Sequence, residues 1–331
     1  MKAKFLVIGS NSFSGSHFID HCINKNHQVI GISRSKEKKN FFLKYKSNKK
    51  LKSKFKFYKL DINNDMSKIK KMIKSYKPTH IVNFASQSMV AQSWEMPLDW
   101  YRTNVISSVK LIQSIKSMKF LKRYVHISTP EVYGNTPKNL RENTSYNPTT
   151  PYAISRASFD MHLMQEAINF DLPVVFTRAA NVYGPGQDLY RIIPRSIFSC
   201  YSKNTMKLDG GGLSKRSFIY IDDVVRGTYK VAISGKKQSI FHISTNQEIS
   251  ILNLVKKIFK FCNSDFKKKV IIGPERKGKD KIYSLNSSKI KKELRWKPKV
   301  SLNEGIKKTI NWFELNKKKL IKEKVIYQHK K

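Results

Sequence analysis

The chain has 331 residues and a formal net charge of +42, from 65 Lys and Arg residues against 23 Asp and Glu residues. Its apolar runs are no longer than a strand, which argues against a membrane-spanning helix. Its lysines are spread over the whole chain without an aromatic-interleaved basic stripe, which argues against a nucleic-acid partner. The three cysteines are far apart in the sequence and predict neither a disulfide framework nor a metal site. We therefore expect a cytoplasmic protein without a metal, whose charge attracts an anionic, phosphate-bearing ligand.

Over the first 178 residues, short apolar segments alternate with amphipathic ones. The pattern predicts strands at 4–9, 28–33, 55–61, 80–85, 123–128 and 173–178, and helices at 15–25, 67–76, 104–118 and 152–170. Strands that alternate with helices at this spacing are typical of a parallel sheet covered on both faces. The predicted fold class is therefore α/β, with a Rossmann-type doubly wound parallel sheet in residues 1–178.

The pattern changes after Arg178. Residues 181–187 are rich in turn formers and predict a loop, and residues 210–212 predict a turn. Further elements are expected as a strand at 218–221 and as helices at 192–202, 222–234, 249–262 and 302–315. We expect residues 179–320 to form a smaller mixed α/β domain, with a segment near 215–245 returning to the first domain. Residues 321–331 form a basic tail that we expect to fray.

The first strand and the first helix are joined by the turn Gly9-Ser-Asn-Ser12-Phe-Ser-Gly15. Such a turn brings backbone N–H groups and a helix N-terminus against a pyrophosphate, which predicts a dinucleotide site. Ser12 stands where the usual fingerprint has its middle glycine. At the end of the second strand, Ser33 and Arg34 stand in place of the acidic residue that binds the ribose of NAD, so they favour NADP and leave NAD open. Asp61, after the third strand, is placed to meet the adenine.

A second motif combines Thr129-Pro130-Glu131 with Tyr152 and, four residues later, Arg156. A tyrosine hydroxyl has a pKa of about 10, and a cation fixed nearby favours the tyrosinate and moves that pKa toward neutrality. Such a tyrosine can take a proton from a sugar hydroxyl while hydride leaves the same carbon. Glu131 can take a second proton, from carbon. Two proton-transfer groups with different tasks indicate more than a simple alcohol oxidation.

These motifs belong to a larger set that covers nearly the whole chain. The set comprises residues 9–15, 83–88, 103–105, 128–134, 151–156, 181–185, 216–218, 222–224, 294–298 and 305–312. With this set the chain resembles the extended short-chain dehydrogenase/reductase family, specifically the nucleotide-sugar 4,6-dehydratases. The resemblance implies a Rossmann domain, a nucleotide-sugar-binding domain in residues 179–320, and a homodimer formed through the two long helices that begin near residues 104 and 152.

The resemblance also implies a mechanism. Tyr152 removes the proton of the sugar 4-hydroxyl while hydride passes from C4 to the nicotinamide, and Thr129 hydrogen-bonds the same oxygen. Glu131 removes the C5 proton, water leaves from C6, hydride returns to C6 and a proton returns to C5. The NAD or NADP cofactor is therefore tightly bound and regenerated within each turnover. The product is a 4-keto-6-deoxy sugar that is still attached to its nucleotide.

Further site residues follow from the same resemblance. The implied catalytic residues are Thr129, Glu131, Tyr152 and Arg156. Cofactor contacts are implied for Gly9, Asn11, Ser12, Phe13, Ser14, Gly15, Ser33, Arg34, Asp61, Ile62, Phe84, Ala85, Ser86, Asn104, Ser128, Tyr152 and Arg156. Substrate contacts are implied for Gln87, Ser88, Asn181, Arg191, Arg216 and Arg276. No metal is implied.

Two positions depart from the family pattern. Arg156 stands where the family has a lysine that lowers the tyrosine pKa and bonds the nicotinamide ribose, and we expect the arginine to serve both roles. Pro130 stands where the thymidine-diphosphate-glucose dehydratases have an aspartic acid that protonates the departing C6 hydroxyl. GDP-mannose dehydratases also lack that acid, whereas residues 179–186 are closer to the thymidine-diphosphate-glucose group. Glu131, or a water that it holds, then has to act as the acid, and both dTDP-glucose and GDP-mannose stay open as substrates.

Alternatives to the dehydratase remain open. A nucleotide-sugar 4-epimerase needs Tyr152 and Thr129 but not Glu131. A nucleotide-linked uronic acid decarboxylase also carries the Thr-x-Glu pattern. From another class, a binding protein could keep this fold and have lost its chemistry through Arg156 and Pro130. Nucleic-acid binding, drawn from the net charge alone, is the weakest alternative.

Overall fold

A parallel sheet forms the centre of the molecule, in a computed structural model that describes residues 2–135, 139–274 and 284–330. In the described chain the sheet has seven strands in the order β10–β6–β5–β4–β1–β2–β3. The strands are β1 Lys4–Ile8, β2 Gln28–Ser33, β3 Phe55–Lys59, β4 His80–Asn83, β5 Arg123–Ser128, β6 Val174–Ala179 and β10 Ser239–Ile243. Because β1 pairs in parallel with both β2 and β4, the strand order reverses there. The predicted doubly wound parallel sheet is confirmed, and ligands of such sheets bind at the carboxyl ends of the strands at this reversal.

Strand β1 illustrates why these residues form a strand with two buried faces. Side chains alternate across a strand, so Phe5 and Val7 lie on one face and Leu6 and Ile8 on the other. All four are essentially inaccessible to solvent and belong to two different hydrophobic clusters. Burying a side chain of this size stabilises the fold by about 1.5–3 kcal/mol. A continuous apolar run is therefore what a parallel strand with helices on both sides requires.

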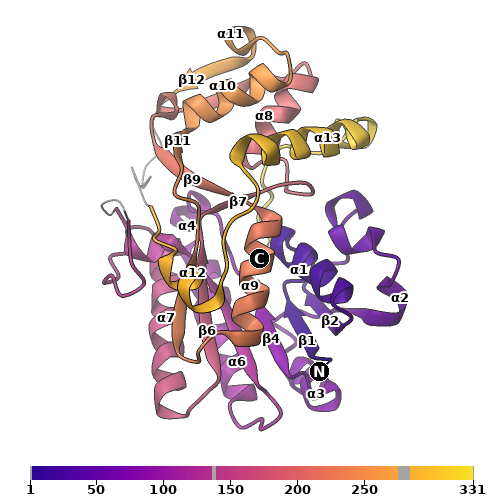
Figure 1. Ribbon diagram of the computed structural model, residues 1–331, viewed down its shortest axis with the longest axis vertical. Helices are drawn as coiled ribbons and strands as arrows, with labels where there is room; N and C mark the ends of the chain where they lie inside the picture. Colours follow the sequence, from indigo (N-terminus) through magenta and orange to yellow (C-terminus); the bar gives the residue numbers. More distant parts are fainter. Residues whose placement is uncertain (1, 136–138, 275–283, 331) are drawn as a thin grey trace.

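Helices cover both faces of the sheet (Figure 1). On one face lie α1 Phe13–Asn24 and α9 Ile221–Ser234, which pack against each other. On the other face lie α3 Met66–Tyr76, α6 Ser107–Ile115 and α7 Pro151–Asn169. Short helices in the connections are α2 Leu51–Lys54, α4 Gln92–Glu95 and α5 Pro97–Tyr101. Among the residues that the structure describes, no helix is both long and apolar enough to cross a membrane.

A smaller mixed α/β domain lies above the carboxyl ends of the sheet, at the top of Figure 1. Its strands are β7 Asn181–Tyr183, β9 Lys215–Tyr220 and β11 Glu248–Ser250 in one sheet, and β8 Met206–Asp209 with β12 Val270–Gly273 in another. Its helices are α8 Ile192–Tyr201, α10 Ile251–Phe261, α11 Phe266–Lys269 and α13 Leu302–Leu320, while α12 Ser288–Leu294 packs beside β10 and α9. The predicted second, smaller domain is confirmed.

Several segments differ from the sequence prediction. The predicted loop at 181–187 begins as strand β7, because Asn181 and its neighbours pair in parallel with β9. The helix expected from residue 104 is preceded by a π-helical turn, Arg102–Ile106, and α6 ends at Ile115. Strands β8, β10, β11 and β12 were not predicted, and all four are short. Strands β8 and β12 pair only with each other.

Residues 321–330 pack against the rest of the protein instead of fraying, so that expectation is wrong for the described part of the tail. Helix α13 continues to Leu320, and residues 321–330 then cross the carboxyl edge of the central sheet. His329 stacks on Trp100 with ring centroids 5.2 Å apart and lies 2.7 Å from an oxygen of Asp99. Lysine-rich composition predicted solvation, but two aromatic side chains, Tyr327 and His329, hold the segment against the rest of the protein.

Candidate active site

One large cavity lies where β1, β4 and β5 end, between the central sheet and the smaller domain. Its volume is about 1150 Å³, and it is lined by loops of both domains and by the tail. Cations outnumber carboxylates among its charged lining residues, which are Arg34, Lys36, Lys38, Asp61, Glu131, Asp188, Arg191, Arg195, Lys207, Asp209, Arg216, Lys322, Glu323, Lys324 and Lys330. A cavity of this size and charge suits a large anionic ligand.

The glycine turn fits a dinucleotide at one end of the cavity. Gly9 has φ +82°, and a Cβ at this position would lie 2.8 Å from the backbone N of Ala85. A Cβ on Gly15 would lie 2.4 Å from the carbonyl oxygen of Gly9. Ser12 has an extended backbone, and its hydroxyl accepts a hydrogen bond from Gly15 N at 3.0 Å, so it caps α1. The helix N-terminus is therefore open to a phosphate although the middle glycine is missing.

The end of β2 carries hydroxyl groups and cations toward the same cavity. The hydroxyl of Ser33 accepts a hydrogen bond from Asn11 N at 3.0 Å, and Asn11 Nδ2 donates to the carbonyl of Ser35 at 2.9 Å. Arg34 donates to the carbonyl of Lys330 at 2.9 Å. The nearest acid in sequence, Glu37, accepts hydrogen bonds from Tyr45 and Lys46 instead, at 2.8 Å and 2.7 Å. Among the described residues, no acidic side chain at the end of β2 is therefore positioned to bind the ribose of a cofactor.

Thr129, Glu131 and Tyr152 form a cluster on the opposite wall. Thr129 follows β5 and donates its hydroxyl hydrogen to Oε2 of Glu131. Thr150 caps α7 by accepting from Ala153 N at 3.2 Å, and Pro151 occupies the first turn, so Tyr152 is held at the helix start. Tyr152 is near enough to Thr129 for the threonine hydroxyl to lower its pKa. The predicted hydroxyl, carboxylate and phenol therefore meet in one cavity.

The pKa of Tyr152 differs from the sequence expectation. Burial and the negative charge of Glu131 raise it to about 12, and the opposing effects of Arg156 and of the Thr129 hydrogen bond are smaller. The expected movement toward neutrality is therefore wrong for this arrangement. The physical reason is that the phenol is buried next to a carboxylate, while the cation that favours the phenolate is engaged elsewhere.

Arg156 lies one turn after Tyr152 on the same helix face but has its own partners. Its guanidinium donates to the carbonyl of Ile127 and lies 3.2 Å from Nε2 of His126. Only 3% of the residue is exposed, and it does not line the cavity as described. A guanidinium is longer and planar compared with an ammonium, so it reaches beneath β5. Contact with a nicotinamide ribose stays a prediction.

A buried polar network continues from Arg156. The carboxylate of Asp160 lies 3.2 Å from His126, accepts from the hydroxyl of Ser128 and pairs with Arg178 at 2.8 Å. Burial alone would raise the pKa of Asp160, but the hydrogen bond from His126 and the charge of Arg178 hold it below its ordinary value. Burial lowers the pKa of His126 to about 4, so this histidine is neutral at pH 7. Sequence analysis identified none of these contacts.

Most predicted cofactor residues line the cavity. They are Gly9, Asn11, Ser12, Phe13, Ser14, Ser33, Arg34, Asp61, Ile62, Phe84, Ala85, Ser86, Ser128 and Tyr152. Gly15, Asn104 and Arg156 are not among its described lining residues. Gly15 instead allows close packing, and the buried amide of Asn104 donates to the carbonyl of Gln87 and to the hydroxyl of Ser155, both at 3.0 Å. Asn104 thus fixes the loop that follows β4.

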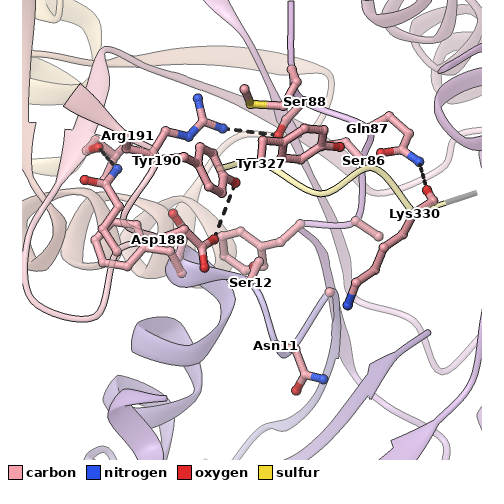
Figure 2. A pocket seen from close by; sticks show the side chains of 18 of the residues that line it. Asn11, Ser12, Ser86, Gln87, Ser88, Asp188, Tyr190, Arg191, Tyr327 and Lys330 are labelled. Carbon is pink, nitrogen blue, oxygen red and sulfur yellow. Dashed lines mark hydrogen bonds between the residues drawn. The ribbon is translucent and has the colours of Figure 1, made fainter. Parts of the chain in front are cut away.

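The predicted substrate residues also line the cavity, except for Arg276, which lies outside the described residues. The lining residues are Gln87, Ser88, Asn181, Arg191 and Arg216. Arg191 lies with its guanidinium 3.3 Å from the hydroxyl of Ser88 (Figure 2). Asn181 Nδ2 donates to the carbonyl of Ser217 at 3.2 Å. Arg195 also lines the cavity, so three arginines of the smaller domain converge there.

Sequence analysis missed two groups of lining residues. One is the segment 187–190, in which the hydroxyl of Tyr190 lies 3.5 Å from Asp188 (Figure 2). The other is the tail, whose residue Lys330 accepts a hydrogen bond from Gln87 at 2.7 Å through its carbonyl (Figure 2). For the tail, the aromatic residues were the only feature of the sequence that could have indicated that it packs against the protein. In the described part of the chain, no group of three His, Cys, Asp or Glu side chains could hold a metal ion.

Comparison with known proteins identifies the family. The model of the family described as GDP-mannose 4,6 dehydratase matches residues 6–309. The chain belongs to this family. Relatives of this dehydratase-family protein include the dTDP-D-glucose 4,6-dehydratase of Bos taurus, 31% identical over 95% of this chain and 89% of the relative. The dTDP-glucose 4,6-dehydratase of Escherichia coli is 28% identical over 95% of this chain and 94% of the relative. The resemblance predicted from the motifs is confirmed.

Solved structures resemble the dehydratase-family protein over nearly its whole length. The dTDP-glucose 4,6-dehydratase of Streptomyces venezuelae, solved with NAD bound, has a TM-score of 0.89 at 28% identity and covers 96% of this chain and 100% of its own. The UDP-glucose 4-epimerase of Thermotoga maritima, solved with UDP-glucose, has a TM-score of 0.85 at 28% identity and covers 95% of this chain and 99% of its own. The fold is therefore shared by dehydratases and epimerases, and the site has to distinguish them.

Proposed function

We propose that this protein is a nucleotide-sugar 4,6-dehydratase that acts on a dTDP-hexose of the glucose type. One observation carries the proposal: Thr129, Glu131 and Tyr152 meet in a cavity that also contains the glycine turn. The phenol and the hydroxyl suit oxidation at C4, and the carboxylate supplies the second base that elimination needs. The curated relatives named above, which act on dTDP-glucose, support the choice of nucleotide.

Each residue of the cluster has one task. A bound nicotinamide supplies the chemistry of accepting a hydride and returning it. Tyr152 takes the proton of the 4-hydroxyl in its phenolate form, which the charge of Arg156 favours against the burial that raises its pKa, and Thr129 orients the same oxygen. Glu131 takes the C5 proton, which the neighbouring keto group has acidified. The C6 oxygen leaves with a proton as water, and a proton returns to C5, so the sum of the steps is loss of one water.

Pro130 cannot protonate the leaving oxygen, so another group has to do it. Glu131 carries a proton once it has taken the one from C5, and can pass it to the C6 oxygen. Its contact with Thr129 holds the carboxylate at the cluster. The Glu131 carboxyl group would then act as the base toward C5 and afterwards as the acid toward the C6 oxygen in the same elimination.

For the cofactor, we propose NADP ahead of NAD. Ser33, Arg34 and Ser35 stand at the end of β2, and Glu37 is bonded to Tyr45 and Lys46. Guanidinium and hydroxyl groups suit a 2′-phosphate, whereas a carboxylate would suit a free 2′-hydroxyl. NAD is bound in the solved relatives, so titration of the protein with each dinucleotide is the direct test. Tighter binding of NAD would contradict this preference.

For the substrate, we propose that residues 179–320 hold the nucleotide diphosphate. Arg191, Arg195 and Arg216 line the cavity, and guanidinium groups offer paired donors to phosphate. The hexose would then meet the catalytic cluster, since the three arginines and the cluster line the same cavity. We also propose a homodimer, because Ile154, Met161 and Ile168 of α7 are exposed at a spacing of seven residues.

The decisive experiment incubates the protein with dTDP-glucose, UDP-glucose and GDP-mannose and follows loss of water by mass. Dehydration of dTDP-glucose is expected. The variant Glu131→Gln should lose dehydration by about 10²–10⁴-fold. Glu95→Gln, an exposed change of the same type, is the matched control. The competing function, a 4-epimerase, is favoured by the solved epimerase of the same fold, and it predicts inversion at C4 that survives Glu131→Gln.

A further inference from the structure

The segment 322–330, called here the strap, runs along the rim of the active-site cavity. Residues Lys322, Glu323, Lys324, Ile326, Tyr327, Gln328 and Lys330 all line it. The strap has no helix or strand of its own, so its position depends on contacts with other parts of the chain. Those contacts are with both domains.

On the Rossmann side, the strap is tied down at its far end. The carbonyl of Lys330 accepts hydrogen bonds from Gln87 at 2.7 Å and from Arg34 at 2.9 Å. The ammonium of Lys330 donates to the hydroxyl of Ser35 at 3.2 Å. One strap residue therefore bridges the loop after β2 and the loop after β4, which flank the dinucleotide crevice. Figure 2 shows its contact with Gln87.

Two aromatic contacts hold the middle of the strap. The ring of His329 is stacked on Trp100 with an interplanar angle of 9°, and its Nε2 lies 2.7 Å from Asp99. The ring of Tyr327 packs edge-on against Tyr190, with centroids 5.3 Å apart. Tyr190 belongs to the smaller domain and Trp100 to the Rossmann domain, so the strap joins the two walls of the cavity.

The strap lines the cavity and leaves most of it open. About 1150 Å³ remains with the strap in position, and the same space is lined by Gly9, Ser12 and Phe13 of the phosphate turn. A dinucleotide bound along this turn would be enclosed by the bridge that Lys330 forms between the two sides of the crevice. Release of the dinucleotide would require that bridge to open.

We propose that the strap retains the bound dinucleotide, and that Tyr327 and His329 are the residues that keep it closed. The inference rests on the proposed function, because an enzyme that regenerates its cofactor in each turnover gains from never releasing it. A second consequence concerns the 2′-phosphate: the strap brings the cation of Lys330 next to Arg34 and Ser35. NADP should therefore be retained longer than NAD.

The test measures exchange of dinucleotide in the full-length protein. Protein loaded with NADP, or with NAD, is mixed with an excess of fluorescent NADPH or NADH, and the exchange rate gives the dissociation rate constant. Tyr327→Ala and His329→Ala should each raise that constant about tenfold, while the association rate constant changes much less. Leu315→Ala, an exposed apolar truncation on α13, should change neither. Circular dichroism of each variant checks that it is folded.

Two results would overturn the proposal. Dissociation rates unchanged in both folded variants would mean that the strap does not retain the ligand. Faster association with unchanged dissociation would mean that the strap blocks entry instead. Dehydration of dTDP-glucose is assayed separately on the same samples. If the protein dehydrates the sugar but every variant exchanges dinucleotide at the same rate, the proposed function stands and the proposed role of the strap is wrong. If the variants exchange dinucleotide faster but the protein does not dehydrate the sugar, the role of the strap stands and the proposed function is wrong.

Discussion

Arg178 and Asp160 form an ion pair at 2.8 Å in which neither side chain is exposed to solvent. The pair lies next to the end of β5 that precedes Thr129, since Asp160 also accepts from Ser128 and lies 3.2 Å from His126. His126 in turn contacts Arg156 at 3.2 Å. A chain of buried polar contacts therefore connects the core of the sheet to the cation that follows Tyr152.

We expect Asp160→Asn to destabilise the protein by about 3–5 kcal/mol, because it leaves the buried charge of Arg178 uncompensated. Thermal unfolding measures the change. Asp171→Asn is the matched control, since Asp171 pairs with Lys237 at the surface with 73% of its side chain exposed, and its loss should cost less than about 1 kcal/mol. Equal effects of the two substitutions would show that the buried pair has no special role.

Removing the charge of Glu131 should lower the pKa of Tyr152. That charge is the second cause, after burial, that raises the pKa to about 12, so Glu131→Gln removes a repulsion against the phenolate. Ultraviolet difference titration measures the pKa, with Tyr152→Phe as the blank that identifies the signal. The titration of Tyr152 should begin at lower pH in Glu131→Gln than in the unaltered protein. A shift to higher pH would contradict the described geometry.

Arg156→Lys and Arg156→Met separate the charge of Arg156 from its shape. The positive charge lowers the pKa of Tyr152, so Arg156→Met should raise that pKa further and move the rising limb of the pH–rate profile to higher pH. Arg156→Lys keeps the charge but loses the hydrogen bond to Ile127, and we expect it to retain activity within about tenfold. Dehydration rates measured from pH 6 to pH 10 check both expectations. Identical profiles for the two variants would mean that the charge has no influence.

The sequence was informative where local pattern decides structure. The continuous apolar run of residues 5–8 follows from a strand that is buried on both faces, and the cluster of Thr129, Glu131 and Tyr152 follows from the meeting of strand ends and helix starts in a parallel sheet. The direction of the Arg156 guanidinium could not be predicted, because it depends on His126, thirty positions earlier in the chain. The tail could not be predicted either, because its partners are Trp100 and Tyr190, far from it in sequence.

Acid should destabilise the fold through its buried histidines. Burial and the charge of Arg178 lower the pKa of His242 from 6.5 to about 3. Its stabilising contribution is complete above pH 6.5, and it is lost as the pH falls toward 3, because the unfolded chain takes up a proton that the folded protein does not. Between pH 6.5 and pH 4 this histidine should account for about 3 kcal/mol of lost stability.

Chemical denaturation of His242→Gln at several pH values tests this expectation. The variant should lose less stability than the unaltered protein between pH 6.5 and pH 4, even if it starts from a lower value. His162→Gln is the control, because 37% of the His162 side chain is exposed. An unchanged slope in His242→Gln would show that His242 takes up its proton in the folded state.

The exposed stripe on α7 should mediate self-association. Ile154, Met161 and Ile168 recur every seven residues, so they lie along one face of the helix, and 39%, 53% and 53% of their surfaces are exposed. Helix pairs with this spacing bury such stripes against a second copy. Met161→Glu would place a charge at the centre of that contact and should convert a dimer into a monomer in light scattering. Leu315→Glu, at a residue with 78% exposure on α13, should leave the mass unchanged. A monomeric unaltered protein, or a dimer that survives Met161→Glu, would assign this face another role.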